Sequence, residues 1–210
     1  AFIDTARRLG KLAHPALPRV LRIIEANGTL YQLRPDRPGE TLASLVARDG
    51  RAAPETVRTA LVELSRALEQ LHDAGLIHGG VSLATTWIAP DGTPFLRGIG
   101  APATDPDPAA APEQLADRPE LTPATDLYRL AATLLHWLSG APPATAEERL
   151  EARAADAPDP LVIETGDAGG GLDDALGRGL RLDPKRRPGS MEDWREALDR
   201  IDWRTRMARE

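Results

Sequence analysis

The side chains that could act in acid–base or metal chemistry are few and scattered along this sequence. The chain has no cysteine, which excludes thiolate catalysis, disulfides and Cys-ligated metals. Of its four histidines, His14, His72 and His136 have no partner at metal-ligand spacing, so we expect structural or surface roles for them. His78 titrates near neutral pH and invites a catalytic role, but we expect a packed loop histidine.

Three aspartates in predicted loops could hold a metal ion or accept a proton. Asp91 belongs to an Asp-Gly turn at the far end of a short hairpin. Asp105 and Asp107 lie in an irregular stretch of Ala, Pro and Asp between positions 100 and 112, from which they could reach a cleft. We expect both to be solvated loop charges.

Composition and charge limit the kinds of protein and partner that fit this sequence. A chain of 210 residues that is 41% hydrophobic can bury one substantial core. The net charge of -6 argues against nucleic acid or an anionic membrane as partner, because such binding needs clustered Lys and Arg. No apolar run approaches the ~18–20 residues of a membrane helix and no signal-peptide pattern opens the chain, so we expect a cytoplasmic location and no membrane insertion.

The composition and the first residues of the chain also bear on its source and on whether it is complete. Nearly all basic residues are arginine, and alanine and proline are frequent, which suggests a GC-rich bacterial coding sequence. The first residue is Ala1 rather than methionine, and helical sequence follows without a capping residue. We therefore expect a segment of a longer protein.

The first third of the chain predicts a small helix and a hairpin. Apolar residues at helical spacing predict a helix over 2–12, which a Pro-rich stretch ends. Two β-rich segments at 20–26 and 29–33 are joined by Asn27-Gly28, which suits a type I′ turn. Residues 34–41 hold two prolines and a glycine in a polar stretch and predict a linker.

The remainder is predicted to be mainly helical. An apolar stripe opened by Pro54 and closed by Gly75 predicts a long core-facing helix. After a second small hairpin over 86–96, the strongly hydrophobic segment from Thr122 to Gly140 predicts a helix buried on more than one face. Further helices are expected at 144–156, 172–181 and 190–207.

This order of elements, together with four local motifs, resembles the protein-kinase family. LIHGGVSLATTWIAPDGTPFLRGIG, at 76–100, is similar to the family's catalytic loop H-R-D-L-x-x-x-N, its following strands and its D-F-G turn. APEQL at 111–115 matches the A-P-E motif. DLYRLAATLLHWLSG from Asp126 resembles the start of the family's central helix, and LDPKRRP at 182–188 resembles the loop before its last helix.

The resemblance implies an α+β, mainly α fold. Residues 1–35 would be the remnant of a kinase N-terminal lobe, with the family's αC helix and one β-hairpin, 36–41 a hinge-like linker, and 42–210 the kinase-like C-terminal lobe. The strands that carry the glycine-rich loop and the ATP-binding lysine are absent from the sequence. Thr5, or Asp4 with a one-residue shift, stands where the family's lysine-pairing acid would be.

The positions that perform phosphoryl transfer in the family are degenerate here. Gly80 replaces the H-R-D aspartate, which serves as base, and Ser82 replaces the lysine two residues on. Thr85 and Gly98 replace the two magnesium ligands, so we expect no metal and no cofactor. Gly79 replaces the arginine that would receive an activation-loop phosphate.

The positions that support the kinase scaffold are retained. His78, Glu113, Asp126 and Arg187 stand where the family keeps its structural polar contacts. The resemblance implies that Glu113 pairs with Arg187, and that Asp126 accepts backbone N–H groups of the catalytic loop.

The leading hypothesis is therefore a catalytically inactive kinase-like domain, a pseudokinase. It would act as a regulatory or protein-interaction module on a protein partner or on neighbouring domains of a longer chain. One alternative is an active or atypical serine/threonine kinase-like phosphotransferase that uses ATP and Mg²⁺. A second is a structural helical platform between domains, which a pocket filled by Trp87 or Phe95 would favour.

Overall fold

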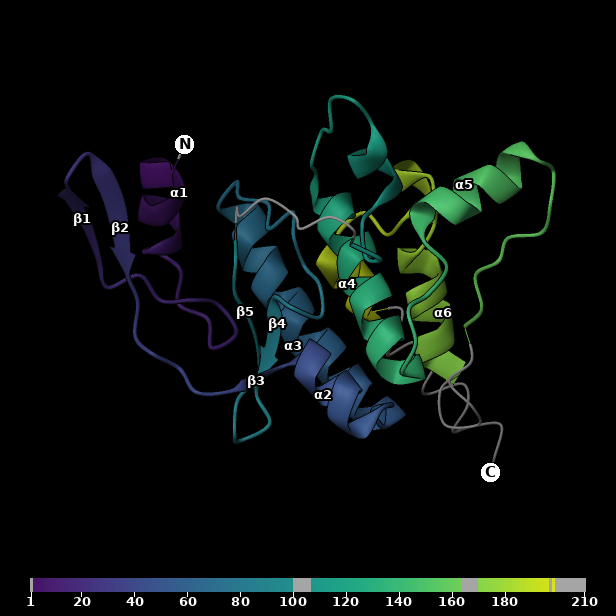
Figure 1. Ribbon diagram of the computed structural model, residues 1–210, viewed down its shortest axis with the longest axis horizontal. Coiled ribbons are helices and arrows are strands. Elements are labelled where there is room, and N and C mark those ends of the chain that lie inside the picture. Colours follow the sequence, from purple (N-terminus) through teal and green to yellow (C-terminus); the bar gives the residue numbers. More distant parts are fainter. Residues whose placement is uncertain (1, 100–106, 164–169, 197, 199–210) are drawn as a thin grey trace.

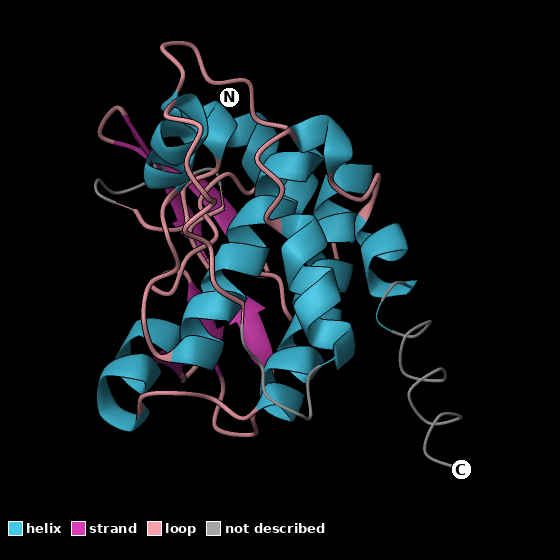
Figure 2. Cartoon of the chain, turned by 90° about the vertical axis from the view of Figure 1, so that its right-hand side faces the viewer, coloured by secondary structure: helices cyan, strands magenta, loops and turns pink. Residues whose placement is uncertain are grey.

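The computed structural model describes residues 2–99, 107–163, 170–196 and 198. Figure 1 shows a helical body with a small unit of one helix and two strands at one side. Figure 2 shows how far helices outweigh strands in that body. The fold is mainly α with small sheets, which confirms the predicted class of a kinase-like helical lobe with a reduced N-terminal lobe.

The small unit consists of α1 (Phe2–Leu9) and an antiparallel hairpin of β1 (Arg22–Ala26) and β2 (Thr29–Leu33). Asn27 and Gly28 join the strands with φ angles of 54° and 69°. Two successive positive φ angles are those of a type I′ turn, which matches the right-handed twist of the paired strands. The predicted hairpin and its turn are thus confirmed.

A second sheet has the order β3-β4-β5 and joins the linker to the helical body. Its members are β3 (Glu40–Thr41), β4 (Thr86–Ile88) and β5 (Pro94–Leu96), all antiparallel. The sequence predicted the β4–β5 hairpin but not β3, which lies in the stretch assigned to the linker. A two-residue strand is too short to show an alternating pattern, so only its pairing with β4 reveals it.

The centre of the helical body is the pair α3 (Pro54–Asp73) and α4 (Pro123–Ser139), which pack against each other. The helix α4 is buried on all sides from Thr125 to Leu135 and ends at Gly140, whose φ of 74° is left-handed. The predicted central helix is confirmed. A neighbouring helix, α2 (Leu42–Asp49), was not predicted, because Leu42 is its one buried residue and eight residues give little periodicity.

Shorter elements complete the described chain. They are η1 (Pro112–Leu115), α5 (Ala146–Ala154), α6 (Gly170–Gly179), η2 (Pro184–Arg186) and helical residues 191–196. The predicted end of the last helix, beyond 198, lies outside the described residues. No helix in the described part of the chain is both long and apolar enough to cross a bilayer.

Candidate kinase-like site

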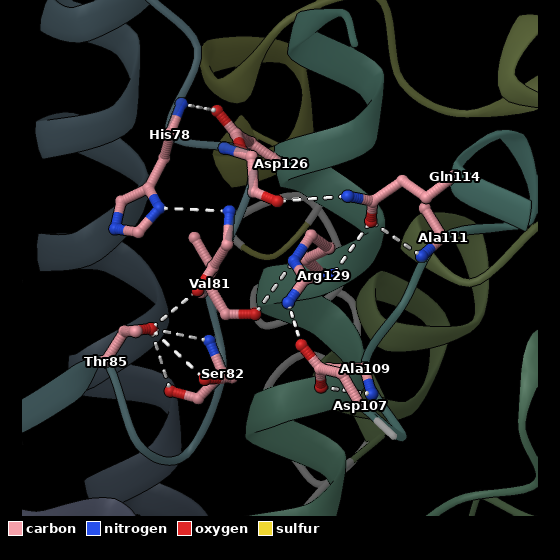
Figure 3. A network of polar contacts seen from close by, with 12 residues as sticks. His78, Val81, Ser82, Thr85, Asp107, Ala109, Ala111, Gln114, Asp126 and Arg129 are labelled. Carbon is pink, nitrogen blue, oxygen red and sulfur yellow. Dashed lines mark hydrogen bonds and ion pairs between the residues drawn. The ribbon is translucent and has the colours of Figure 1, made fainter. Parts of the chain in front are cut away.

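The loop of residues 78–85 is held in place by a buried carboxylate at the start of α4. Asp126 accepts the backbone N–H of His78 on Oδ2 at 2.8 Å and that of Gly79 on Oδ1 at 2.7 Å (Figure 3). The imidazole Nε2 of His72, on α3, lies 2.9 Å from the same Oδ2. Asp126 thus joins α3, α4 and the loop, and the structure gives it the backbone contacts that the resemblance implied.

The backbone conformation of this loop requires glycine at position 79. Its φ is 71°, in the left-handed region that L residues avoid. A β-carbon at this position would lie 2.9 Å from Cδ1 of Leu121. The loop backbone therefore accepts glycine here and resists any side chain.

The imidazole of His78 is buried and takes part in the loop's own hydrogen bonding. Its Nδ1 accepts the backbone N–H of Gly80 at 3.2 Å. Burial lowers the pKa of His78 below its ordinary value; the Asp126 carboxylate opposes this and the Arg129 guanidinium adds to it. A neutral imidazole that accepts a bond from its own loop has a structural role.

Thr85 closes the end of the loop onto its beginning. Its Oγ1 donates to the carbonyl of Gly80 at 2.7 Å and accepts the backbone N–H of Ser82 at 2.9 Å. The Ser82 hydroxyl lies 3.3 Å from the same oxygen. The hydroxyl proton of Thr85 is therefore committed to the loop itself (Figure 3).

These positions do not fit the magnesium that the kinase resemblance implies. Gly98 has no side chain, its φ is 77°, and Thr85 offers only a hydroxyl, whereas Mg²⁺ in kinases is held by a carboxylate and an amide. Gly80 likewise offers no group to accept a proton. Across the described ranges, no three His, Asp or Glu side chains gather as metal ligands.

Arg129 is the site residue that sequence reasoning missed. It is fully buried on α4, one turn after Asp126. Its Nε donates to the carbonyl of Val81 at 3.0 Å, its Nη1 donates to Oε1 of Gln114 at 2.8 Å, and its Nη2 pairs with Asp107 (Figure 3). One guanidinium thus joins the loop to η1 and to the segment that precedes it. The available signal was a charged residue inside a strongly apolar helix, since arginine is rarely buried without partners.

Two further side chains complete this network. The Nε2 of Gln114 donates to the carbonyl of Gly79 at 3.0 Å, and its Oε1 accepts the N–H of Ala111 at 3.0 Å. Oδ1 of Asp107 accepts the N–H of Ala109 at 3.0 Å while Oδ2 pairs with Arg129. The prediction that Asp107 is a solvated loop charge was therefore wrong, because a buried guanidinium draws it inward.

Asp91, the other candidate loop aspartate that the structure describes, does not take part in this network. Asp91 is exposed and accepts the N–H of Thr93 at 2.9 Å, as a turn residue does. Asp105 lies outside the described residues. On α1, Asp4 forms an exposed ion pair with Arg8 at 2.9 Å, and Thr5 is half-buried.

Glu113, in η1, forms an ion pair with Arg187, which directly follows η2. Nη1 and Nη2 of Arg187 lie 2.8 and 2.9 Å from the two carboxylate oxygens, and Thr125 donates to Oε1 at 2.9 Å. Burial alone would raise the pKa of Glu113, but the hydrogen bonds and charge of Arg187, together with the backbone N–H and Thr125, outweigh it and the pKa is lowered. Three segments distant in sequence are thereby joined.

The sequence of the chain is similar to those of several curated proteins. The chain is 27% identical over 229 aligned residues to 3-phosphoinositide-dependent protein kinase 1 of Arabidopsis thaliana, covering 93% of this chain and 45% of the relative. It is 27% identical over 201 residues to serine/threonine-protein kinase PknD of Mycobacterium tuberculosis, covering 88% and 30%. It is 31% identical over 160 residues to PknA of the same species, covering 68% and 37%. The chain is a relative of the protein kinases.

The chain spans less than half the length of each of these three kinases. No family model matches it.

Within this kinase-like lobe, the loop of residues 78–85 is held by side chains of α4 and η1. Asp126, Arg129 and Gln114 fix the loop through hydrogen bonds to its backbone. Gly80, Thr85 and Gly98 are the residues that the resemblance assigned to the family's base and its two metal ligands. The polar contacts that the resemblance implied for Asp126, Glu113 and Arg187 are present in the structure.

Proposed function

We propose that this chain is a catalytically inactive protein kinase-like domain that regulates or binds another protein. The observation that carries the proposal is the combination of glycine at 80 and 98 with a Thr85 hydroxyl turned onto its own loop. The partner would be a separate protein or a neighbouring domain of the same chain. We also propose that the protein is bacterial and is located in the cytoplasm.

The energetic argument rests on what phosphoryl transfer requires. The protein must position ATP, hold magnesium and orient the acceptor hydroxyl. Loss of a general base costs ~10²–10⁴ in rate, and a site without carboxylates leaves the charge on the phosphates unneutralised. Gly80 and Gly98 can supply neither function.

The network around Arg129 supports a binding role over a catalytic one. Its bonds to Val81, Gln114 and Asp107 tie the loop to η1 and to the segment before it through the protein's own groups. A loop that is fixed in this way is suited to recognise a partner, because little conformational entropy is lost on binding.

The alternative of an active or atypical kinase-like phosphotransferase is favoured by the relatives, each of which is named a protein kinase. The alternative of a purely structural platform receives less support. Phe95 is buried, yet an open cavity of about 510 Å³ remains beside it, so aromatic side chains do not fill the space.

The decisive experiment measures transfer of ³²P from γ-labelled ATP, with Mg²⁺ or Mn²⁺, to the chain itself and to a mixture of Ser-, Thr- and Tyr-containing peptides. We expect no incorporation above a reaction without protein, while an active serine/threonine kinase in parallel labels the same peptides. Metal-dependent incorporation that persists after removal of trace kinases would overturn the proposal and favour the phosphotransferase.

A further inference from the structure

A pocket beside α5 lies at the end of the molecule opposite the small N-terminal unit (Figure 1). Its volume is about 440 Å³, within the ~300–1,000 Å³ of ligand sites. Three segments form it: the last turns of α5, the stretch that follows α5, and the chain around η2. Among the described residues that line it Leu182 is the one apolar side chain, and the others are Arg149, Arg153, Asp159, Arg181, Asp183 and Arg186. The pocket therefore fits a charged group rather than an apolar one.

One wall of the pocket is held by a buried arginine. Nε and Nη2 of Arg149 lie 2.9 and 2.8 Å from the two carboxylate oxygens of Asp159, and Nη1 donates to the carbonyl of Leu180 at 2.7 Å. The hydrogen bonds from Arg149 hold the pKa of Asp159 below its ordinary value, although partial burial opposes them. The charge of Asp159 is therefore already compensated within the protein.

The opposite wall is fixed by hydrogen bonds to its backbone. Nε of Arg187 donates to the carbonyl of Arg181 at 2.8 Å, and Nη2 donates to that of Leu182 at 3.3 Å. Oδ1 of Asp183 accepts the N–H of Lys185 at 2.9 Å and so caps η2. Both carboxylates that line the pocket are thus engaged by the protein's own groups.

Three arginines of the pocket have no acidic partner. They are Arg153, Arg181 and Arg186, all exposed. In the part of the chain that the structure describes, no carboxylate forms an ion pair with any of them. Nη1 of Arg181 donates to the carbonyl of Arg186 at 2.6 Å, which orients this guanidinium without neutralising it. Four arginines against two aspartates leave an excess of two positive charges, in a protein whose net charge is -6.

We propose that this pocket binds a phosphorylated serine or threonine of a protein partner. A phosphoryl group on a side chain carries a charge of about −1.5 to −2 and three acceptor oxygens, which match the excess of two charges and the three unpaired guanidinium groups. A carboxylate has a single charge and two oxygens, so it satisfies the pocket less completely. Because the three arginines are exposed, a side chain on another protein can reach them. The inference rests on the proposed function, since it names the kind of partner that an interaction module would recognise.

The test begins with short peptides that have a central phosphoserine and randomised flanking residues, selected on the 210-residue chain in EDTA. The tightest peptide is then titrated by ¹H–¹⁵N NMR, beside its serine and glutamate versions and inorganic phosphate. We expect saturable shifts at 149–159 and 180–187 but not in the 78–85 loop. The phosphopeptide should bind at least about tenfold more tightly than the glutamate peptide or free phosphate, and the serine peptide should not bind.

Variants separate this pocket from general attraction to positive charge. Arg153→Gln and Arg186→Gln should each weaken the phosphopeptide affinity about three- to tenfold, because each removes a donor in an exposed site. The control Arg178→Gln removes a neighbouring exposed arginine that lies outside the pocket and pairs with Asp174 at 2.7 Å, and should change the affinity less than about twofold. Circular dichroism and thermal unfolding of each ligand-free variant show whether it folds.

Several results would overturn the assignment. They are the retention of no phosphopeptide, equal affinity for the glutamate peptide or for inorganic phosphate, shifts that map to the 78–85 loop, and equal losses in the Arg178 and Arg186 variants. If Arg186→Gln does not fold, Arg153→Gln on α5 decides the question. None of these results bears on the ³²P transfer assay, so failure of this inference is distinguishable from failure of the proposed function.

Discussion

Arg129 and Asp107 form an ion pair in which the two side chains are 0% and 9% exposed. The pair connects α4, at the centre of the body, to the segment that leads into η1. Because the same guanidinium also donates to the carbonyl of Val81, the pair couples that segment to the 78–85 loop. One buried cation thus links the 78–85 loop to the segment that leads into η1.

Removal of that cation should destabilise the protein and loosen the segment before η1. Arg129→Met leaves the buried Asp107 carboxylate without its ion-pair partner and the carbonyl of Val81 without its guanidinium donor, so the free energy of unfolding in urea should fall by about 3–5 kcal/mol. Amide exchange at 107–115 should accelerate. In the double variant Arg129→Met/Asp107→Leu the loss should be smaller, because no charge remains buried. Equal losses in the single and double variants would contradict this account.

A matched pair of glycine substitutions tests the shape of the loop. Gly79→Ala and Gly92→Ala both place alanine at a positive φ, 71° and 84°, which costs ~1–2 kcal/mol. Only at Gly79 would the new β-carbon meet another atom, Cδ1 of Leu121 at 2.9 Å; at Gly92 nothing lies within 4 Å. Urea unfolding should show the larger loss for Gly79→Ala. Similar losses would mean that the 78–85 loop adapts to a side chain.

The pairing of Glu113 with Arg187 predicts an acid-sensitive contact. The pKa of Glu113 is lowered in the folded protein, so the pair contributes stability above the ordinary carboxyl range and loses it as the pH falls through the folded pKa. Glu113→Gln should therefore reduce the free energy of unfolding at neutral pH, by about 1–3 kcal/mol, and reduce it less under acidic conditions. Urea titrations at about pH 7 and about pH 4 check the difference. A loss that is the same at both values would show that the charge of Glu113 is not what matters.

His78 predicts a second pH dependence at milder acidity. Burial lowers its pKa in the folded state, so between that pKa and about 6.5 the unfolded chain binds the additional proton. Stability from this group is complete above pH ~6.5 and declines as the pH falls below it. His14 and His136, whose pKa values burial also lowers, add to the same slope. His78→Asn should make the decline in the free energy of unfolding between about pH 7.5 and 5.5 shallower. An unchanged slope would exclude His78 as its source.

Local chemistry allowed much of the fold to be predicted from sequence. Asn27-Gly28 determines its turn through the backbone freedom of those two residues, and the apolar stripes of α3 and α4 determine two buried helices. The motif positions also follow from sequence order, which is how Asp126 and the pair of Glu113 with Arg187 could be named in advance. The prediction that Gly80, Thr85 and Gly98 stand at the family's catalytic positions rests on the same sequence order.

Tertiary structure decided the partners of the charged side chains. Arg129 lies 48 residues from Val81 and 22 from Asp107. An arginine side chain is long and carries five donors, so its neighbours in sequence do not specify which acceptors it meets. The periodicity of the sequence shows which face of a helix or strand is apolar. Only the folding together of distant segments determines which acceptor a buried charged side chain meets.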